Sequence, residues 1–314
     1  MSSLREVKDR IASVRSTLKI TSAMKLVASS KLRKAQRAIE ALRPYSEALE
    51  AILAAVQRSD TGGFGGSAPR PLGVQGDSSR PLMERSDMSR LEGQSAPGAT
   101  KAVVIAIASN SSMCGAFNVN AAKRALELLD SAEGETELWT FGRKVADILR
   151  KEGHPADRDF TRLVAHPSFE AVAELSAELM GRYASGEISC VMLVYNHFVS
   201  AGRQEVVVEP FIGSAVILNE RSEVKNLNSP DLLYIIEPSS AELTELLYPQ
   251  ILNLKLYSAI LDSAAAEHAA RMVAMQAATD NAEELLGELT LEYNKGRQHK
   301  ITSEILDIVG GSME

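Results

Sequence analysis

The chain has 314 residues, of which 45% are hydrophobic and 24% charged, proportions typical of a globular protein rather than a disordered or fibrous one. No apolar run approaches the ~20 residues that a membrane-spanning helix needs, so we expect no integral membrane segment. The two cysteines, Cys114 and Cys190, are too few for a disulfide framework or a zinc quartet, which fits a reducing compartment.

The net charge of −7 is unevenly distributed along the chain. Residues 1–43 hold eleven Lys or Arg against three acids, whereas residues 240–314 hold five basic residues against twelve acids. A basic segment alone could bind nucleic acid or an acidic surface, but here the other end of the same chain supplies the opposite charge. We therefore expect the two ends to pair with each other, and we predict no nucleic-acid partner.

The first 43 residues are also rich in Arg and Ser, as an organellar transit peptide is. We do not favour that interpretation, because the helical pattern runs unbroken out of the segment and no cleavage-like site interrupts it. A secretory signal is excluded, since no apolar stretch follows Met1.

Residues 1–57 are predicted to form one long coiled-coil helix. Ser3 and Glu6 have the spacing of a capping box. Pro44 lies inside the pattern and is expected to bend the helix without ending it. A helix of about 55 residues is ~80 Å long and needs a partner along its length. Its first apolar residues recur at steps of three and four, as in a coiled-coil seam, and are Leu4, Val7, Ile11, Val14 and Leu18. The pattern resumes through Leu26, Ala35, Ile39, Leu42, Leu49 and Val56.

Residues 58–99 have a different composition. Eight Gly, four Pro and seven Ser fall in this segment, and no apolar periodicity persists. We interpret it as a flexible insertion. The string GGFGG at 62–66 could suggest a phosphate-binding loop, but it lacks the flanking strand and helix that such a loop needs.

Residues 100–238 are predicted to form a Rossmann-like α/β domain. Strands alternate with helices, which is typical of a mainly parallel sheet. We expect the last strand, at 203–217, to be antiparallel at the sheet edge. The predicted strands before it are 102–108, 138–141 and 189–195, and the predicted helices are 117–130, 143–152 and 168–183.

Residues 239–314 are predicted to be a second coiled-coil segment. We place the start of its helix at Pro249, because proline is tolerated in a first helical turn, and its end at Gly310 and Gly311. At roughly 90 Å it matches the first helix in length. The sequence therefore predicts an antiparallel coiled coil of the two terminal helices plus a central α/β domain. The apolar face of the second helix consists of Leu254, Ile260, Leu261, Met272, Met275, Leu285, Leu286, Leu289, Ile301, Ile305 and Ile308.

Catalytic motifs are missing from the sequence. There is neither a Walker A loop nor a Gly-x-Ser-x-Gly motif, and the five histidines take no metal-ligand spacing. We expect His268 and His299 to be solvated or interface residues of the long helix. Cys114 follows a strand and precedes a helix, where some α/β enzymes carry a nucleophile, but a structural turn cysteine is the favoured interpretation. We predict no catalytic residue, cofactor or metal.

Five strings in this order resemble the gamma subunit of F-type ATP synthases. They are KITSAMKLVASSKLRKAQ at 19–36, MCGAFNVN at 113–120, AEHAARM at 266–272, LTLEYNKGRQ at 289–298 and ITSEILDIVGG at 301–311. The resemblance covers 1–57 and 100–314. The family usually has Ser where this chain has Ala266, Ala where it has Gly296, and Gly-Ala where it has Gly311-Ser312; a glycine inside a helix costs ~1 kcal/mol relative to alanine. The insertion at 58–99 is longer than usual and lacks the cysteine pair of the photosynthetic subunits, so thiol regulation is not implied.

The resemblance implies a rotor shaft that couples ion flow to ATP synthesis in an alpha/beta hexamer, and it does not imply catalysis by this chain. The implied partners are the alpha and beta subunits, the epsilon subunit and the membrane ring of c subunits, at the cytoplasmic face of a bacterial plasma membrane. The positions that the resemblance places against the hexamer are Met24, Lys25, Arg33, Arg297, Gln298 and Thr302.

Two alternatives remain open from the residues. One is a non-rotary scaffold in which an α/β module carries a coiled-coil stalk. The other is an α/β enzyme that uses Cys114. A solvated helix face is the competing interpretation of the six interface positions.

Overall fold

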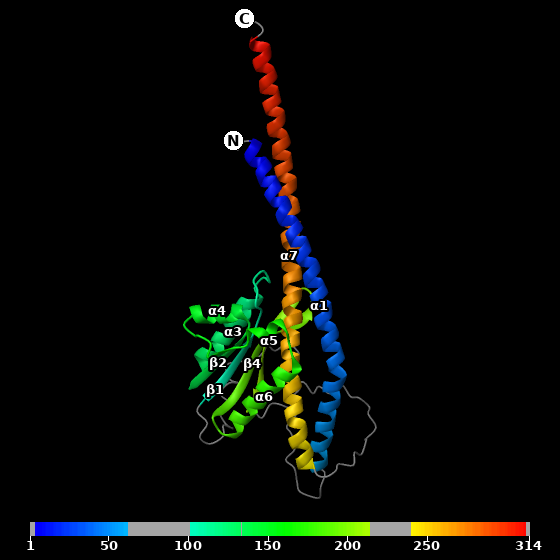
Figure 1. The fold of residues 1–314 in the computed structure, drawn as a ribbon, viewed down its shortest axis with the longest axis vertical. Coiled ribbons are helices and arrows are strands. Elements are labelled where there is room, and N and C mark those ends of the chain that lie inside the picture. Colours follow the sequence, from blue (N-terminus) through cyan, green and yellow to red (C-terminus); the bar gives the residue numbers. More distant parts are fainter. Residues whose placement is uncertain (1–3, 62–100, 133, 214–239, 312–314) are drawn as a thin grey trace, which may run out of the picture.

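Two very long helices form the framework of the computed structural model, which describes residues 4–61, 101–132, 134–213 and 240–311. Helix α1 spans Leu4–Thr61 and helix α7 spans Ser240–Gly311. They lie side by side and run in opposite directions, and α7 continues well past the first residues of α1 (Figure 1). The antiparallel coiled coil predicted from the sequence is confirmed.

The seam of α1 keeps its alternating steps of three and four, but it passes through polar residues. Thr21 and Ala28 are buried, whereas the predicted seam residue Leu26 is 68% exposed. The prediction for Leu26 was wrong because the regular steps from Leu18 fall on Thr21, Lys25 and Ala28, and Leu26 lies about 100° further round the helix. An apolar side chain one position off the seam faces outward.

Two polar layers occupy this part of the seam. The hydroxyls of Thr21 and Thr279 are hydrogen-bonded at 3.0 Å. One turn along, the Lys25 ammonium donates to Gln276 Oε1 at 2.5 Å, and Gln276 Nε2 donates to Asp280 at 2.6 Å. Hydrogen-bonded polar residues in an apolar seam favour one register, because any slip leaves buried polar groups unpaired.

Within the part of the chain that the structure describes, the last turns of α7 have no partner helix. Leu4 lies beside Gly296, where an added Cβ would come within 3.1 Å of Leu4 Cδ2, so this small residue accommodates the start of α1. Beyond it, Ile301, Ile305 and Ile308 are exposed. Their assignment to the helix–helix seam was therefore wrong, since α1 does not reach them. Leu285, 44% exposed, also lies off the seam.

Helix α7 begins nine residues earlier than predicted, at Ser240, and Pro249 lies inside it. A proline inside a helix removes one backbone hydrogen bond. Apolar packing on both sides of Pro249 offsets that loss, because Leu247 and Leu254 are buried in one cluster with Leu49 of α1. Pro44 is likewise inside α1, as expected.

A five-stranded sheet forms the centre of the α/β domain, in the order β3-β2-β1-β4-β5. Among the described strands only the pairing of β4 with β5 is antiparallel, which confirms the predicted mainly parallel sheet with an antiparallel edge. The strands are β1 (Lys101–Ile107), β2 (Glu135–Phe141), β3 (Arg158–Asp159), β4 (Ile188–Ser200) and β5 (Arg203–Ile212). Residues 214–217 of the predicted edge strand, and 62–99 of the predicted insertion, lie outside the described residues.

Helices cover both faces of the sheet. The helices are α3 (Phe117–Ser131), α4 (Arg143–Lys151), α5 (Thr161–Ala165) and α6 (Phe169–Ala184). Alternate residues of β1 enter two cores: Ile105 packs with α6 and α7, and Val104 packs with α3 and α4. Because β1 is buried on both faces of the sheet, its sequence is a nearly continuous apolar run.

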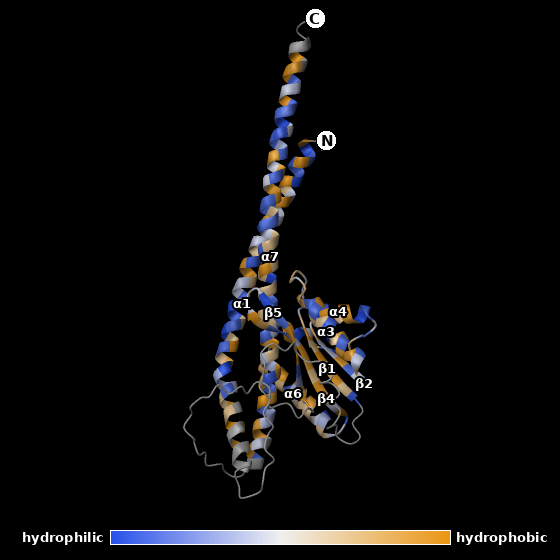
Figure 2. Cartoon of the chain, turned by 180° about the vertical axis from the view of Figure 1, so that it is seen from behind, coloured by the Kyte–Doolittle hydropathy of each residue, from blue (hydrophilic) through white to orange (hydrophobic). Residues whose placement is uncertain are grey.

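The sheet is therefore the hydrophobic centre of the molecule, whereas polar and apolar residues alternate along the free part of the shaft (Figure 2). Helix α7 belongs to both units, since Leu252 and Leu256 lie in the core of the α/β domain while Ala265 and Ala269 pack on Leu32 of α1. Within the described residues, no helix is long and apolar enough to cross a membrane.

The polar layer gives a direct test of register. Replacing Thr21 and Thr279 together by cysteine should yield a disulfide on mild oxidation, because their hydroxyl oxygens lie 3.0 Å apart in the buried seam. The measurement is the mobility shift of the full chain on a non-reducing gel. The matched control pairs Leu26→Cys with Thr279→Cys, and it should not cross-link because Leu26 faces solvent. Equal cross-linking of both pairs would contradict the register.

Candidate functional site

The six predicted interface residues fall into two groups along the shaft. Arg297, Gln298 and Thr302 lie on α7 at the level where α1 begins. Met24 lies twenty positions along α1, which is ~30 Å further down the shaft. The structure thus brings the α7 residues together and separates them from the α1 residues, of which Arg33 lies nine positions beyond Met24. One small site cannot contain all six.

Arg297 and Gln298 are exposed and adjacent, so their side chains leave the helix about 100° apart. No described residue forms a hydrogen bond or ion pair with either side chain, which leaves the guanidinium donors and the amide available to a partner. Thr302 is exposed too, but its hydroxyl donates to the carbonyl of Gln298 at 2.9 Å. Two polar side chains are thus available here, with a third that is bonded within the helix.

The lower group differs in character. Lys25 is half-buried and its ammonium is engaged with Gln276 across the seam, so it contributes to helix pairing. Met24 is half-buried beside it, and Arg33 is exposed about two and a half turns further on. Of these three residues, only Arg33 presents an exposed charge.

Exposed apolar residues surround both groups, and the sequence analysis missed their role. Ile20, Leu26 and Val27 lie on α1 around Met24, each more than half exposed. Leu291, Ile301, Ile305, Leu306 and Ile308 are exposed around the upper group. Extended exposed apolar surface marks a contact site for another protein. For Ile20, Leu26 and Val27 the available signal was their position off the three-four seam of α1.

Cys114 sits in the turn between β1 and α3 and is 1% exposed. Burial raises the pKa of its thiol. Asn118 Nδ2 donates to Sγ at 3.1 Å, while Asn118 Oδ1 accepts from the Ser109 backbone N–H at 3.0 Å. A buried, protonated thiol that is hydrogen-bonded within its own turn acts as a structural residue, as predicted, and does not suit a nucleophile.

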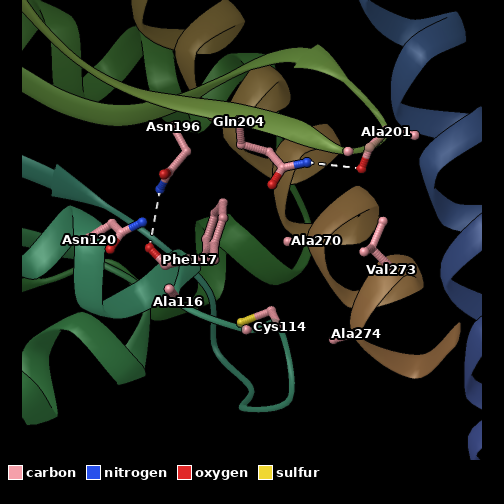
Figure 3. A pocket seen from close by; sticks show the side chains of 12 residues that line it. Cys114, Ala116, Phe117, Asn120, Asn196, Ala201, Gln204, Ala270, Val273 and Ala274 are labelled. Atoms are coloured by element: carbon pink, nitrogen blue, oxygen red, sulfur yellow. Dashed lines mark hydrogen bonds between the residues drawn. The ribbon is translucent and has the colours of Figure 1, made fainter. Parts of the chain in front are cut away.

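A hollow of about 260 Å³ lies between the start of α3, the β4–β5 turn and α7 (Figure 3). Its lining holds small residues such as Gly115 and Ala274, the ring of Phe117 and three carboxamides, and no charged side chain. Asn196, which is buried, donates across it to the Phe117 carbonyl at 3.5 Å. Within the described residues no group of three or more His, Cys, Asp or Glu could hold a metal ion. The hollow contains no acid–base pair for catalysis.

His268 lies on α7 where the two helices meet. Burial lowers its pKa to about 4, with a further contribution from the nearby charges of Arg271 and Lys31. Its Nδ1 is buried without a hydrogen-bond partner. The imidazole is therefore neutral in the folded protein at neutral pH.

This predicts an acid-sensitive contribution to stability. The folded pKa lies below the ordinary value of 6.5, so as pH falls the unfolded chain takes up the proton first and stability is lost between about pH 6.5 and pH 4. His268→Gln should reduce the drop in Tm between about pH 7.5 and pH 5, measured by thermal unfolding of the purified chain. The exposed His299→Gln is the control and should leave the drop unchanged. An equal drop in parent and His268→Gln would refute the assignment.

Comparison with known proteins agrees with this architecture. The family model described as ATP synthase matches residues 3–313. The ATP synthase gamma chain of Phocaeicola vulgatus is 40% identical over 317 residues, covering 100% of both chains. That of Flavobacterium johnsoniae is 39% identical over 313 residues, covering 99% of this chain and 98% of the relative.

Two solved structures share the fold. A chain of the Euglena gracilis mitochondrial ATP synthase rotor, in rotational state 1, superposes with a TM-score of 0.56 at 17% identity, covering 95% of this chain and 98% of that one. A chain of the OSCP/F1/c-ring assembly from the same organism gives 0.60 at 18% identity, covering 99% and 93%.

Proposed function

The chain belongs to the ATP synthase gamma-chain family, and we propose that it turns as the central shaft of an F-type ATP synthase. The observation that carries this proposal is the bare upper part of α7. It projects past α1 with apolar residues exposed around Arg297 and Gln298, whose side chains have no hydrogen-bond or ion-pair partner among the described residues. Exposed apolar surface of this kind marks a contact site for another protein.

The enclosing partner is the alpha/beta hexamer. A shaft that turns inside a hexamer needs an apolar surface that can slide and only a few directional contacts that form and break. The described residues supply both. Because the shaft is asymmetric, each catalytic site meets a different face of it, and differential contacts force the sites into different states. The shaft performs no chemistry itself.

The lower unit connects to the membrane part of the enzyme. The α/β domain lies beside the part of the shaft away from its free end (Figure 1). We assign its partners as the epsilon subunit and the ring of c subunits, so that the chain is peripheral to the cytoplasmic face of a bacterial plasma membrane. The relatives in bacteria and the rotor and c-ring assemblies that share the fold support this assignment.

A pull-down separates this function from the alternative of a non-rotary scaffold. The tagged full chain, expressed in its native background, should co-purify with alpha and beta subunits in a complex that hydrolyses ATP. The scaffold alternative predicts that the tagged chain is recovered without alpha and beta subunits, and that result would contradict the rotor proposal.

Arg297 and Gln298 provide the residue-level prediction. A guanidinium fork suits a carboxylate and an amide can donate and accept, so we propose that the pair holds a polar loop of one beta subunit at one stage of rotation. Each such contact is worth roughly 1–3 kcal/mol. Replacing both by alanine should weaken assembly and lower ATP hydrolysis and ATP-driven pumping together, while the coiled coil stays folded.

The control is Glu283→Ala with Glu284→Ala, which removes two exposed polar side chains from α7 nearer the α/β domain. This variant should assemble and turn over ATP like the parent. Parental assembly and turnover in the Arg297/Gln298 variant would show that the pair is ordinary solvated surface.

A further inference from the structure

The contact between α7 and the α/β domain has an apolar centre. Leu252, Leu256 and Ile260 of α7 are buried in one core with the sheet. Apolar burial holds the two surfaces together but is non-directional, so it gives little resistance to one surface turning against the other. Resistance to turning requires directional bonds between helix and sheet.

Asp262 provides one set of such bonds. Its Oδ2 accepts a hydrogen bond from His197 Nδ1 at 2.5 Å, and its Oδ1 accepts one from the backbone N–H of Phe198 at 3.1 Å. Both partners lie on β4. The carboxylate side chain is 15% exposed, so water competes little for it. Two turns earlier, Lys255 donates to the Pro210 carbonyl on β5 at 2.7 Å, on the same side of the helix.

Arg271 provides a second set. Its guanidinium donates to Ser111 Oγ at 2.7 Å and to the Ser112 carbonyl at 3.3 Å, both in the loop that follows β1. Its other amino group pairs with Glu267 of the same helix at 2.6 Å. The side chains of Arg271 and Glu267 are 11% and 9% exposed. Glu267 thus fixes the guanidinium so that its remaining donors face the loop.

The two sets approach α7 from opposite sides. Asp262 and Arg271 are nine residues apart, which on a regular helix is two and a half turns, or about 180° around the axis. The apolar stripe of Leu256 lies between them. Turning α7 about its own axis in either sense therefore stretches one set of bonds while the other set relaxes.

We propose that Asp262 and Arg271 form a two-sided clamp that transmits torque between the α/β domain and the shaft. The inference rests on the proposed rotary function. Torque that enters at the α/β domain reaches the free end of α7 only if the domain cannot turn against α7. The small side chains Ala259, Ala265, Ala266 and Ala269 bring α7 close to its neighbours but cannot by themselves prevent that turning.

The test uses the assembled enzyme in sealed vesicles and compares ATP-driven ion pumping with ATP hydrolysis. Asp262→Asn combined with Arg271→Gln should hydrolyse ATP at about the parental rate without an opposing gradient. The ratio of pumping to hydrolysis should fall roughly two- to tenfold as the opposing gradient grows, because each lost charge-assisted bond favours slippage. A double variant that carries Arg271→Lys in place of Arg271→Gln keeps a cationic donor and should restore much of the ratio of pumping to hydrolysis.

The matched control is Arg182→Gln. Arg182 pairs with Glu137 at 2.7 Å with side-chain exposures of 16% and 21%, so it is comparably buried, but the pair lies wholly within the α/β domain. Its loss should leave the ratio at the parental value. A ratio that is unchanged in the double variant, or that falls equally in Arg182→Gln, would overturn the clamp.

Two further measurements distinguish failure of the clamp from failure of the proposed rotary function. Ser111→Ala removes the hydrogen bond from Arg271 Nη2 to Ser111 Oγ and keeps the one to the Ser112 carbonyl. It should lower the ratio below the parental value, and by less than the double variant does. This variant tests the clamp by itself where the double variant does not assemble. Amide hydrogen exchange of residues 109–115 in the purified complex should quicken in the Ser111 and Arg271 variants but not in Arg182→Gln. If the parent hydrolyses ATP without pumping, the rotary function fails, and unchanged exchange would overturn the clamp independently.

Discussion

The antiparallel contact between α1 and α7 is the constraint on which the other features of this molecule depend. Neither helix could remain straight and ordered alone over its full length, because most helical stability in proteins comes from packing of one apolar face. In the seam the apolar faces of the two helices pack on each other from Gly296 beside Leu4 at one end to Leu254 beside Leu49 at the other. The α/β domain then packs on a helix that is already fixed by its partner.

The seam combines small and polar residues where another coiled coil would place large apolar ones. Ala28, Ala265 and Ala269 bring the helices close, and the Thr21–Thr279 and Lys25–Gln276 layers fix their register. A shaft built this way is slim and has one register. Its stiffness comes from many weak contacts inside the seam. Because these contacts do not use the outer face of the helices, that face is available to partners. The bare end of α7 and the outward-facing Ile20, Leu26 and Val27 show where that face is apolar.

Much of this fold could be predicted from the sequence, because long helices and buried parallel strands leave strong periodic signals. The antiparallel pairing, the central sheet and the antiparallel edge strand were all predictable. The errors have physical causes. Leu26 was assigned to the seam because an apolar residue was expected where the structure uses Thr21 and Lys25. Ser240 was missed as the helix start because Pro249 resembles a first-turn proline, whereas packing of Leu247 and Leu254 keeps it inside the helix.

The site was less predictable than the fold. Periodicity assigned Ile301, Ile305 and Ile308 to a helix pair, and only the relative ends of α1 and α7 show that they are uncovered. Contacts between distant segments, such as Arg271 with Ser111, follow from how α7 lies across the sheet and leave no local pattern. The β3 strand has two residues and carries no periodic signal at all.

Rotation of the chain inside an immobilised alpha/beta hexamer tests the central claim most directly. A light-scattering probe attached to a single engineered cysteine on an exposed residue of α4, such as Arg150→Cys, reports the angle of the α/β domain and shaft relative to the hexamer. The account predicts one-directional rotation of the probe on addition of ATP, which stops when ATP is exhausted. A probe that stays fixed while the same complex hydrolyses ATP at its full rate would contradict the account.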